Sequence, residues 1–287
     1  MNRVARCRRY RLKPGGDGTL VPMTEALFLF DPSSDDAPVH TDELHSGWNI
    51  TLPQNVRKHA IQVMRLGKGD GLELSDGRGL RIQASIEDPQ NGVVKILSVG
   101  KEAQPTTRLA LIQALAKGGH DEQAIDMATQ IGVDAIIPWQ SDRSIARWKE
   151  GRTDRKWLQV IQSATEQSRR SWRPQLADHV SSKQIAAICK RANVHGDLVI
   201  VLHQDASESW SGIEEAADAM EARCLSDARP RTISVIVGPE GGISDDEIAL
   251  FKDSGAKCCV LGSNILRASC AGAVALSLLS RALGRWS

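Results

Sequence analysis

Two glycine-bearing loops near the carboxyl-terminal end constrain the fold of this chain more than any other feature. Residues 233–276 read ISVIVGPEGGISDDEIALFKDSGAKCCVLGSNILRASCAGAVAL. The run Ile233–Val237 is short and β-branched, which predicts a buried strand, and a second such run, Lys257–Leu261, closes at Gly262. After the first run, Gly238–Gly242 holds three glycines in five residues, and glycine permits positive φ and close approach of the backbone to a ligand.

The residues between and after these loops predict helices. Ser244 followed by Glu247 is the capping-box pattern, so a helix begins here and Gly255 ends it. A second helix of small residues begins at about Ala268. Ligands of an open parallel α/β sheet bind at the carboxyl ends of its strands, so the two loops are the expected site. A glycine loop by itself is more often only a tight turn.

The chain upstream continues the alternation of strands and helices. Strands are predicted at Leu109–Leu115, Val133–Pro138 and Leu198–Leu202, and helices at Asp121–Ile131 and Thr153–Arg169. This order predicts a parallel sheet with right-handed crossovers.

Residues 26–100 have a different pattern, with short β-type runs separated by turn residues, which predicts a small β-barrel. One helical segment interrupts it at Asn55–Leu66, where the spacing places Ala60, Ile61, Val63 and Met64 on the buried face. Residues 101–107 are the expected linker.

Composition limits the possible partners and compartment. The 287 residues include 36 Lys and Arg against 35 Asp and Glu, so any nucleic-acid surface must be a local patch. The six cysteines form no C-x-x-C pair. We therefore expect no metal site, and we expect Cys258 and Cys259 to be reduced core residues in a cytoplasmic protein. No apolar run approaches the roughly 18 residues of a membrane span.

The first 23 residues are basic and glycine-rich. They are expected to be a flexible extension, either an RNA-binding arm or a leader that precedes a translation start at Met23.

The glycine loops resemble a known family. GPEGG, a capped helix, LG, and ILR before a small-residue helix are similar to the carboxyl-terminal signature of SPOUT methyltransferases, specifically the RsmE family. That family methylates N3 of a uridine in small-subunit (16S) ribosomal RNA. HAIQVMRLGKGDGLELSDGRG, LIQALAKGG and ATQIGVDAIIPW extend the similarity upstream. The resemblance implies a trefoil-knotted α/β domain at 105–287, preceded by an RNA-binding PUA-like β-barrel at 24–100.

The same resemblance implies a methyl donor, partners and site residues. The donor is S-adenosylmethionine, the partner is 16S rRNA or the small ribosomal subunit, and the protein is a homodimer. The implied donor-binding residues are Leu202, His203, Gly238, Glu240, Gly241, Gly242, Ile243, Leu261, Gly262, Ile265, Leu266 and Ala271.

The remaining predicted site residues are positively charged. Arg267 is the predicted catalytic residue, because a fixed cation stabilises the anion that uracil becomes on losing its N3 proton. It can equally hold the donor's carboxylate or an RNA phosphate, and the sequence indicates no general base. Predicted RNA-binding residues are Arg57, Lys58, Arg65, Lys68, Arg143, Arg169 and Arg170, although a solvated helix face or a salt-bridged helix end explains some of them as well.

This chain departs from the family after Arg267. The common family sequence is LRTETA, whereas residues 266–271 read LRASCA, and Ser269 cannot act as a carboxylate. An alternative is therefore a non-catalytic RNA-binding or ribosome-assembly protein. A nucleotide-dependent oxidoreductase requires a G-x-G-x-x-G turn, which GPEGG does not match.

Overall fold

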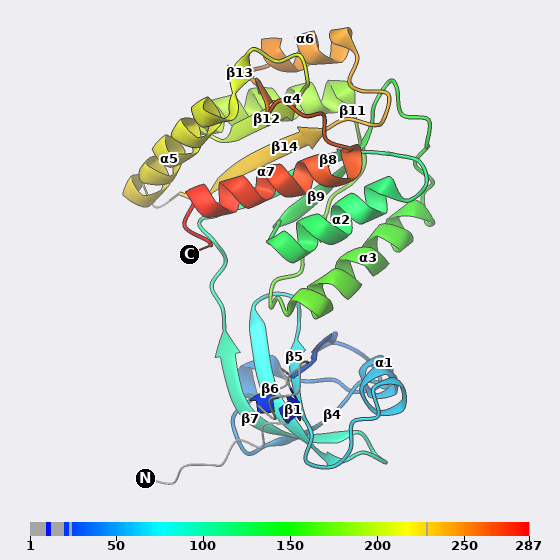
Figure 1. Cartoon of the computed structure of the whole chain (residues 1–287). Helices are drawn as coiled ribbons and strands as arrows, with labels where there is room; N and C mark the ends of the chain where they lie inside the picture. Colours follow the sequence, from blue (N-terminus) through cyan, green and yellow to red (C-terminus); the bar gives the residue numbers. More distant parts are fainter. Residues whose placement is uncertain (1–9, 13–19, 23–24, 228, 287) are drawn as a thin grey trace. The chain divides into compact units, whose positions relative to one another are not determined.

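The computed structural model describes residues 10–12, 20–22, 25–227 and 229–286 (Figure 1). The chain forms two compact units, an amino-terminal unit of residues 1–104 with 169–172 and a carboxyl-terminal unit of 105–168 with 173–287. The predicted basic extension at 1–23 lies largely outside the described residues. Within it, β1 (Tyr10–Leu12) and β2 (Leu20–Pro22) pair in antiparallel fashion.

The amino-terminal unit contains a curled sheet with strand order β3-β5-β6-β7-β4. β3 and β5 run parallel, and the other neighbours run antiparallel. Residues alternate between buried and partly exposed along β6, as expected for strands with one face on a core. The bounds are β3 (Leu27–Leu29), β4 (Asn49–Thr51), β5 (Gly71–Ser75), β6 (Leu80–Asp88) and β7 (Val93–Lys101), with a 3-10 turn η1 (Thr41–Glu43).

The helix predicted at 55–66 is one α-helical turn followed by a π-helical segment, α1 (Gln54–Arg57) and η2 (Lys58–Val63). Ala60 is fully buried and Ile61 is half-buried. The prediction was wrong for Val63 and Met64, whose side chains are 63% and 45% exposed. A π-helical turn holds more residues than an α-helical one, so the spacing of 3.6 assigned these two residues to the wrong face.

A short segment after α3 (Thr153–Ser168) belongs to the amino-terminal unit. Trp172 Nε1 donates to the Glu102 carbonyl oxygen at 3.0 Å, and Ser75 Oγ donates to the Ser171 carbonyl oxygen at 3.0 Å. The predicted helix therefore ends at Ser168, and Arg169 follows with a positive φ of 57°. Sequence spacing gave no sign that the chain returns to this unit, because the partners lie 70 and 96 residues upstream.

The carboxyl-terminal unit is built on a parallel sheet, as predicted, with order β10-β9-β8-β14-β12-β15-β13 and with β11 also paired to β9. The strands are β8 (Thr107–Ala114), β9 (Ala135–Gln140), β10 (Gln175–Leu176), β11 (Val180–Ser181), β12 (Leu198–Leu202), β13 (Glu208–Ser209), β14 (Arg231–Val237) and β15 (Lys257–Val260).

Helices cover both faces of this sheet (Figure 1). One core joins the sheet to α2 (His120–Ile131), α3, α5 (Trp210–Asp227) and α7 (Ala268–Ala282). The other joins it to α4 (Ser182–His195) and α6 (Asp245–Asp253). The predicted capping box of Ser244 and Glu247 is present at α6. Cys258 and Cys259 are buried and free, as predicted, and burial raises the pKa of the Cys259 thiol to about 12.

Helix α7 lies unusually close to the sheet because Gly272 has no side chain. A Cβ on Gly272 would lie 2.8 Å from Leu111 Cδ1 and 3.4 Å from Val237 Cγ2. Since α7 begins directly after a glycine-bearing loop, this close packing fixes where that loop ends.

We predict that Gly272→Ala destabilises the protein by about 1–3 kcal/mol, because the added methyl overpacks the contact with Leu111. Gly212→Ala in α5 is the matched control, since a Cβ there meets no atom within 4 Å. Alanine in an open helical position is expected to be neutral or to stabilise by up to about 1 kcal/mol. Urea unfolding of both variants measures the difference, and equal stabilisation by both would contradict the close approach.

Candidate ligand pocket at the carboxyl ends of β12, β14 and β15

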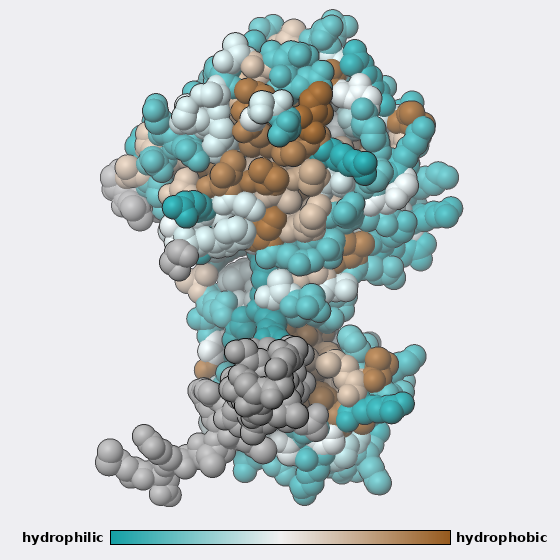
Figure 2. Space-filling view, viewed as in Figure 1, coloured by the Kyte–Doolittle hydropathy of each residue, from teal (hydrophilic) through white to brown (hydrophobic). Residues whose placement is uncertain are grey.

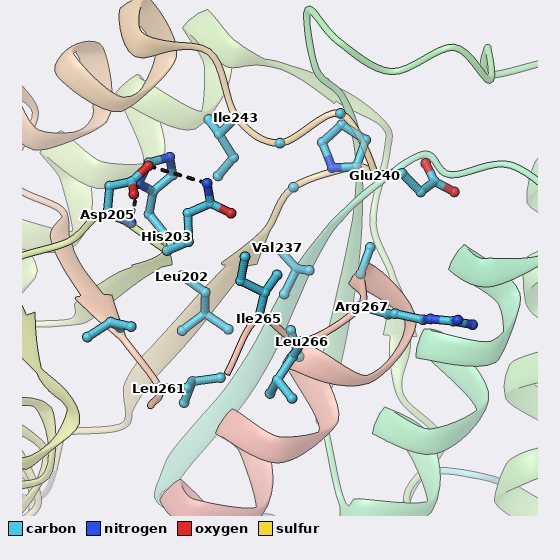
Figure 3. Close-up of a pocket in the computed structure, with 18 of the residues that line it drawn as sticks. Leu202, His203, Asp205, Val237, Glu240, Ile243, Leu261, Ile265, Leu266 and Arg267 are labelled. Atoms are coloured by element: carbon cyan, nitrogen blue, oxygen red, sulfur yellow. Dashed lines mark hydrogen bonds between the residues drawn. The ribbon is translucent and has the colours of Figure 1, made fainter. Parts of the chain in front are cut away.

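A pocket of about 680 Å³ opens at the carboxyl edge of the parallel sheet. Its walls are the loops that follow three neighbouring strands, β12, β14 and β15, together with the start of α7. Figure 3 shows these segments converging on one space. The volume falls within the range of about 300–1,000 Å³ that is typical of small-molecule sites.

The pocket has an apolar wall and a polar rim. Leu202, Val237, Leu261 and Ile265 lie together on one side (Figure 3). Ile265 is 78% exposed, so this wall presents apolar surface that no part of the described chain covers. Such surface is typical of a binding site.

The loop after β14 has a fixed shape. Gly242 has a φ of +74°, and its N–H donates to the Pro239 carbonyl oxygen at 2.9 Å. A Cβ on Gly238 would lie 2.6 Å from Ile243 Cγ1. Glycine is therefore required at both positions, once for backbone conformation and once for space.

Hydrogen bonds from two neighbouring loops hold this loop in place. Arg143 Nη1 donates to the carbonyl oxygens of Gly241 at 3.2 Å and Ile243 at 3.4 Å. The Lys117 N–H donates to Glu240 Oε1 at 3.0 Å. The loops after β8 and β9 thus support the loop after β14, although they lie more than 95 residues away in sequence.

The Glu247 side chain connects the segments around this loop through hydrogen bonds. Its side chain is 2% exposed and accepts hydrogen bonds from the Asp142 N–H at 2.9 Å and from Ser182 Oγ at 2.6 Å. It also accepts from the N–H and the hydroxyl of Ser244, both at 3.1 Å. One buried carboxylate therefore joins the loop after β9, the start of α4 and the start of α6.

Residues after β12 form the other end of the pocket. The Asp205 N–H donates to His203 Nδ1 at 3.3 Å, and Gln204 Nε2 donates to the Asp205 carboxylate at 3.4 Å (Figure 3). These hydrogen bonds order the turn 203–205. In this region the sequence predicted only Leu202 and His203 as site residues.

All the predicted donor-binding residues line this one pocket; that they bind a donor stays a prediction. Arg267 lies at the rim as the N-cap of α7, with its side chain pointing away from the apolar wall (Figure 3). Arg143, predicted for RNA, lines the pocket as well. His120 also lines it and was missed, although it follows the turn after β8 and the rule of strand ends would have found it.

The other predicted RNA-binding residues lie in the amino-terminal unit. Lys58, Arg65 and Lys68 are exposed. Arg57, Arg169 and Arg170 are partly buried, so for these residues a structural role competes with the predicted one. Their role in RNA binding stays a prediction.

Comparison with known proteins assigns the family. Residues 102–280 match the family model of an RNA methyltransferase domain, and residues 52–97 match that of an RNA methyltransferase PUA domain. The chain belongs to this RNA methyltransferase family. The predicted membership of the RsmE family is confirmed, as is the predicted fold class of a parallel-sheet α/β domain preceded by a PUA-like domain. The trefoil knot stays a prediction.

Two relatives with assigned names align with most of this chain. A Mycobacterium tuberculosis protein named ribosomal RNA small subunit methyltransferase E is 34% identical over 79% of this chain and 84% of its own length. A protein of the same name from Synechocystis is 29% identical over 82% of this chain and 73% of its own.

Solved structures share the fold. A putative methyltransferase from Legionella pneumophila in complex with bound S-adenosylmethionine has a TM-score of 0.70 at 26% identity, covering 91% of this chain and 98% of that one. A ribosomal RNA small subunit methyltransferase E from Neisseria gonorrhoeae, at 22% identity and a TM-score of 0.69, covers 90% and 98% and supports the fold alone.

Among the described residues, no group of three or more His, Cys, Asp or Glu side chains is arranged to hold a metal ion. No helix in the described part of the chain has the length and hydrophobicity needed to span a membrane.

We predict that Glu247→Gln lowers the free energy of unfolding by about 1–3 kcal/mol, because the amide group places N–H donors against other buried donors. Asp246→Asn is the control, since Asp246 is exposed in the same first turn of α6 and surface changes usually stay within about 0.5 kcal/mol. Urea denaturation measures both. Equal stability of the two variants would contradict the structural role of Glu247.

Proposed function

We propose that this protein transfers the methyl group of S-adenosylmethionine to small-subunit ribosomal RNA, at N3 of a uridine. The observation that carries the proposal is the pocket at the ends of β12, β14 and β15, within the region that matches the RNA methyltransferase family. The names of the relatives support ribosomal RNA as the substrate. The uridine and its N3 atom rest on the sequence resemblance.

The pocket residues suit the proposed donor. S-adenosylmethionine combines a flat adenine ring with a polar ribose and a charged amino-acid end. The apolar wall of Leu202, Val237 and Leu261 suits the ring, and the backbone amides and carbonyls of the glycine-bearing loops suit the polar groups. When bound, the sulfonium supplies an activated methyl group.

The protein's own contribution is orientation and electrostatics. Aligning the acceptor atom behind the methyl group can supply up to roughly 7–11 kcal/mol of the barrier reduction in favourable cases. The N3 atom becomes nucleophilic when its proton leaves to solvent water, and negative charge then spreads over the uracil carbonyl groups. We assign the stabilisation of that charge to Arg267, which lines the pocket at its rim.

The proposal includes a homodimer and a trefoil knot. Figure 2 shows apolar surface gathered over the region of α7 and the loop before it. Ile265, Leu266 and Val274 are 78%, 37% and 38% exposed there. This surface suits a second copy of the chain, which would then border the pocket.

Incubating the protein with labelled S-adenosylmethionine and unmodified small-subunit rRNA tests the function. We expect label in the RNA and 3-methyluridine among its nucleosides by mass spectrometry. A methyl group on another atom would correct the specificity. Saturable donor binding without transfer, either to free RNA or to assembled subunits, would favour the non-catalytic alternative.

Gly242→Ala tests the pocket directly. Alanine is strained by about 1–2 kcal/mol at positive φ, so we expect the loop to rearrange and the Kd for S-adenosylmethionine to rise about tenfold. Gly284→Ala is the control, because Gly284 has a similar φ of +64° and no neighbouring atom within 4 Å. Calorimetric titration measures both affinities. An equal affinity in both variants would place the donor elsewhere.

We predict that Arg267→Ala lowers kcat about 10²–10³-fold, the usual loss when a donor to a developing anion is removed. The Kd for S-adenosylmethionine should stay unchanged. Arg267→Lys should restore part of the rate. If Arg267→Ala instead weakens donor binding and leaves kcat intact, the arginine holds the donor's carboxylate.

A further inference from the structure

A second cavity of the carboxyl-terminal unit gathers positive charge. It has a volume of about 430 Å³ and lies between the turn after β8, the loop after β9 and the first turns of α3. Its cationic lining residues are Lys117, Arg147, Lys149, Arg152 and Lys156. We call this cavity, with its five cationic residues, the basic cleft.

The charge of the basic cleft is not balanced locally. Two acidic residues, Asp121 and Glu122, also line it. Glu122 pairs with Lys156, and Asp121 is 6% exposed beneath the surface. Among the described residues, Arg147, Lys149 and Arg152 have no acidic partner within ion-pair distance, and all three are exposed. The chain as a whole carries a net charge of only +1, so this concentration is a local feature.

The basic cleft adjoins the donor pocket. The turn 117–119 lines the cleft, and the next residue, His120, lines the donor pocket. Likewise Arg143 lines the pocket, whereas Ala146 and Arg147 line the cleft. The Lys117 N–H donates to Glu240 of the pocket at 3.0 Å. The same two loops, one after β8 and one after β9, therefore line both cavities, which lie next to each other.

We propose that the basic cleft binds phosphate groups of the substrate RNA next to the target nucleotide, an inference that rests on the proposed function. A nucleotide whose base enters the donor pocket carries its chain past the rim, and the adjoining cations are placed to meet the flanking phosphates. Phosphate contacts fix the position of a nucleic acid, whereas base contacts specify it. The cleft thus sets the register of the RNA, and the donor pocket reads the base.

The double variant Arg147→Gln with Arg152→Gln tests the cleft. We expect the KM for rRNA to rise at least tenfold, with kcat within twofold of the wild type and an unchanged Kd for S-adenosylmethionine. The slope of log K against log salt should become shallower by about 1.4, because each single-strand phosphate contact contributes about 0.7.

The control is Lys190→Gln with Arg191→Gln on α4, which lies on the other face of the sheet and exposes both side chains. It removes the same charge, so a general effect of net charge would appear equally in both variants. The measurements use unmodified small-subunit rRNA, both free and in assembled subunits.

Three results would overturn the inference. If the wild type methylates rRNA and the cleft variant matches it in KM and salt slope, the cleft proposal alone fails. If the wild type neither binds nor methylates rRNA, the proposed function fails as well. If inorganic phosphate raises the Tm of the wild type but not of the cleft variant, while RNA binding is the same in both, the cleft holds a small anion instead.

Discussion

The buried carboxylate of Glu247 is the interaction on which the shape of the proposed donor pocket depends. It accepts hydrogen bonds from three segments that sequence separates by up to 105 residues. A buried hydrogen-bond donor without a partner costs about 1–3 kcal/mol. Moving any of these segments away from Glu247 would leave such a donor unpaired, so the hydrogen bonds keep the segments together. Arg143 and Lys117 then support the glycine-bearing loop from the loops next to it.

Small side chains in α7 also help to shape the pocket, because they let the helix pack closely against the sheet. Gly272 lets α7 lie against Leu111 and Val237, so the loop that ends at α7 reaches the carboxyl edge of the sheet. Ser269, which stands where the family commonly has glutamate, is 5% exposed within this packing. Close helix packing is therefore retained where the sequence departs from the family pattern.

Local signals predicted much of the fold and of the pocket. The strand Leu198–Leu202 and the capping box at Ser244 were predicted from short segments, and the rule of strand ends brought the pocket residues together. The rest depended on tertiary contacts. The π-helical turn at Lys58 changed which face of the helix is buried, and the hydrogen bonds of Glu247 and Trp172 join residues far apart in sequence. No local pattern specifies such partners.

Amide hydrogen exchange with and without S-adenosylmethionine would show whether the donor binds in the pocket at the ends of β12, β14 and β15. We expect the donor to slow exchange in residues 202–205, 238–243 and 261–267, the three loops that line the pocket, and to leave exchange in α4 unchanged. Exchange that is unaffected in all three loops, or slowed only in the amino-terminal unit, would contradict it.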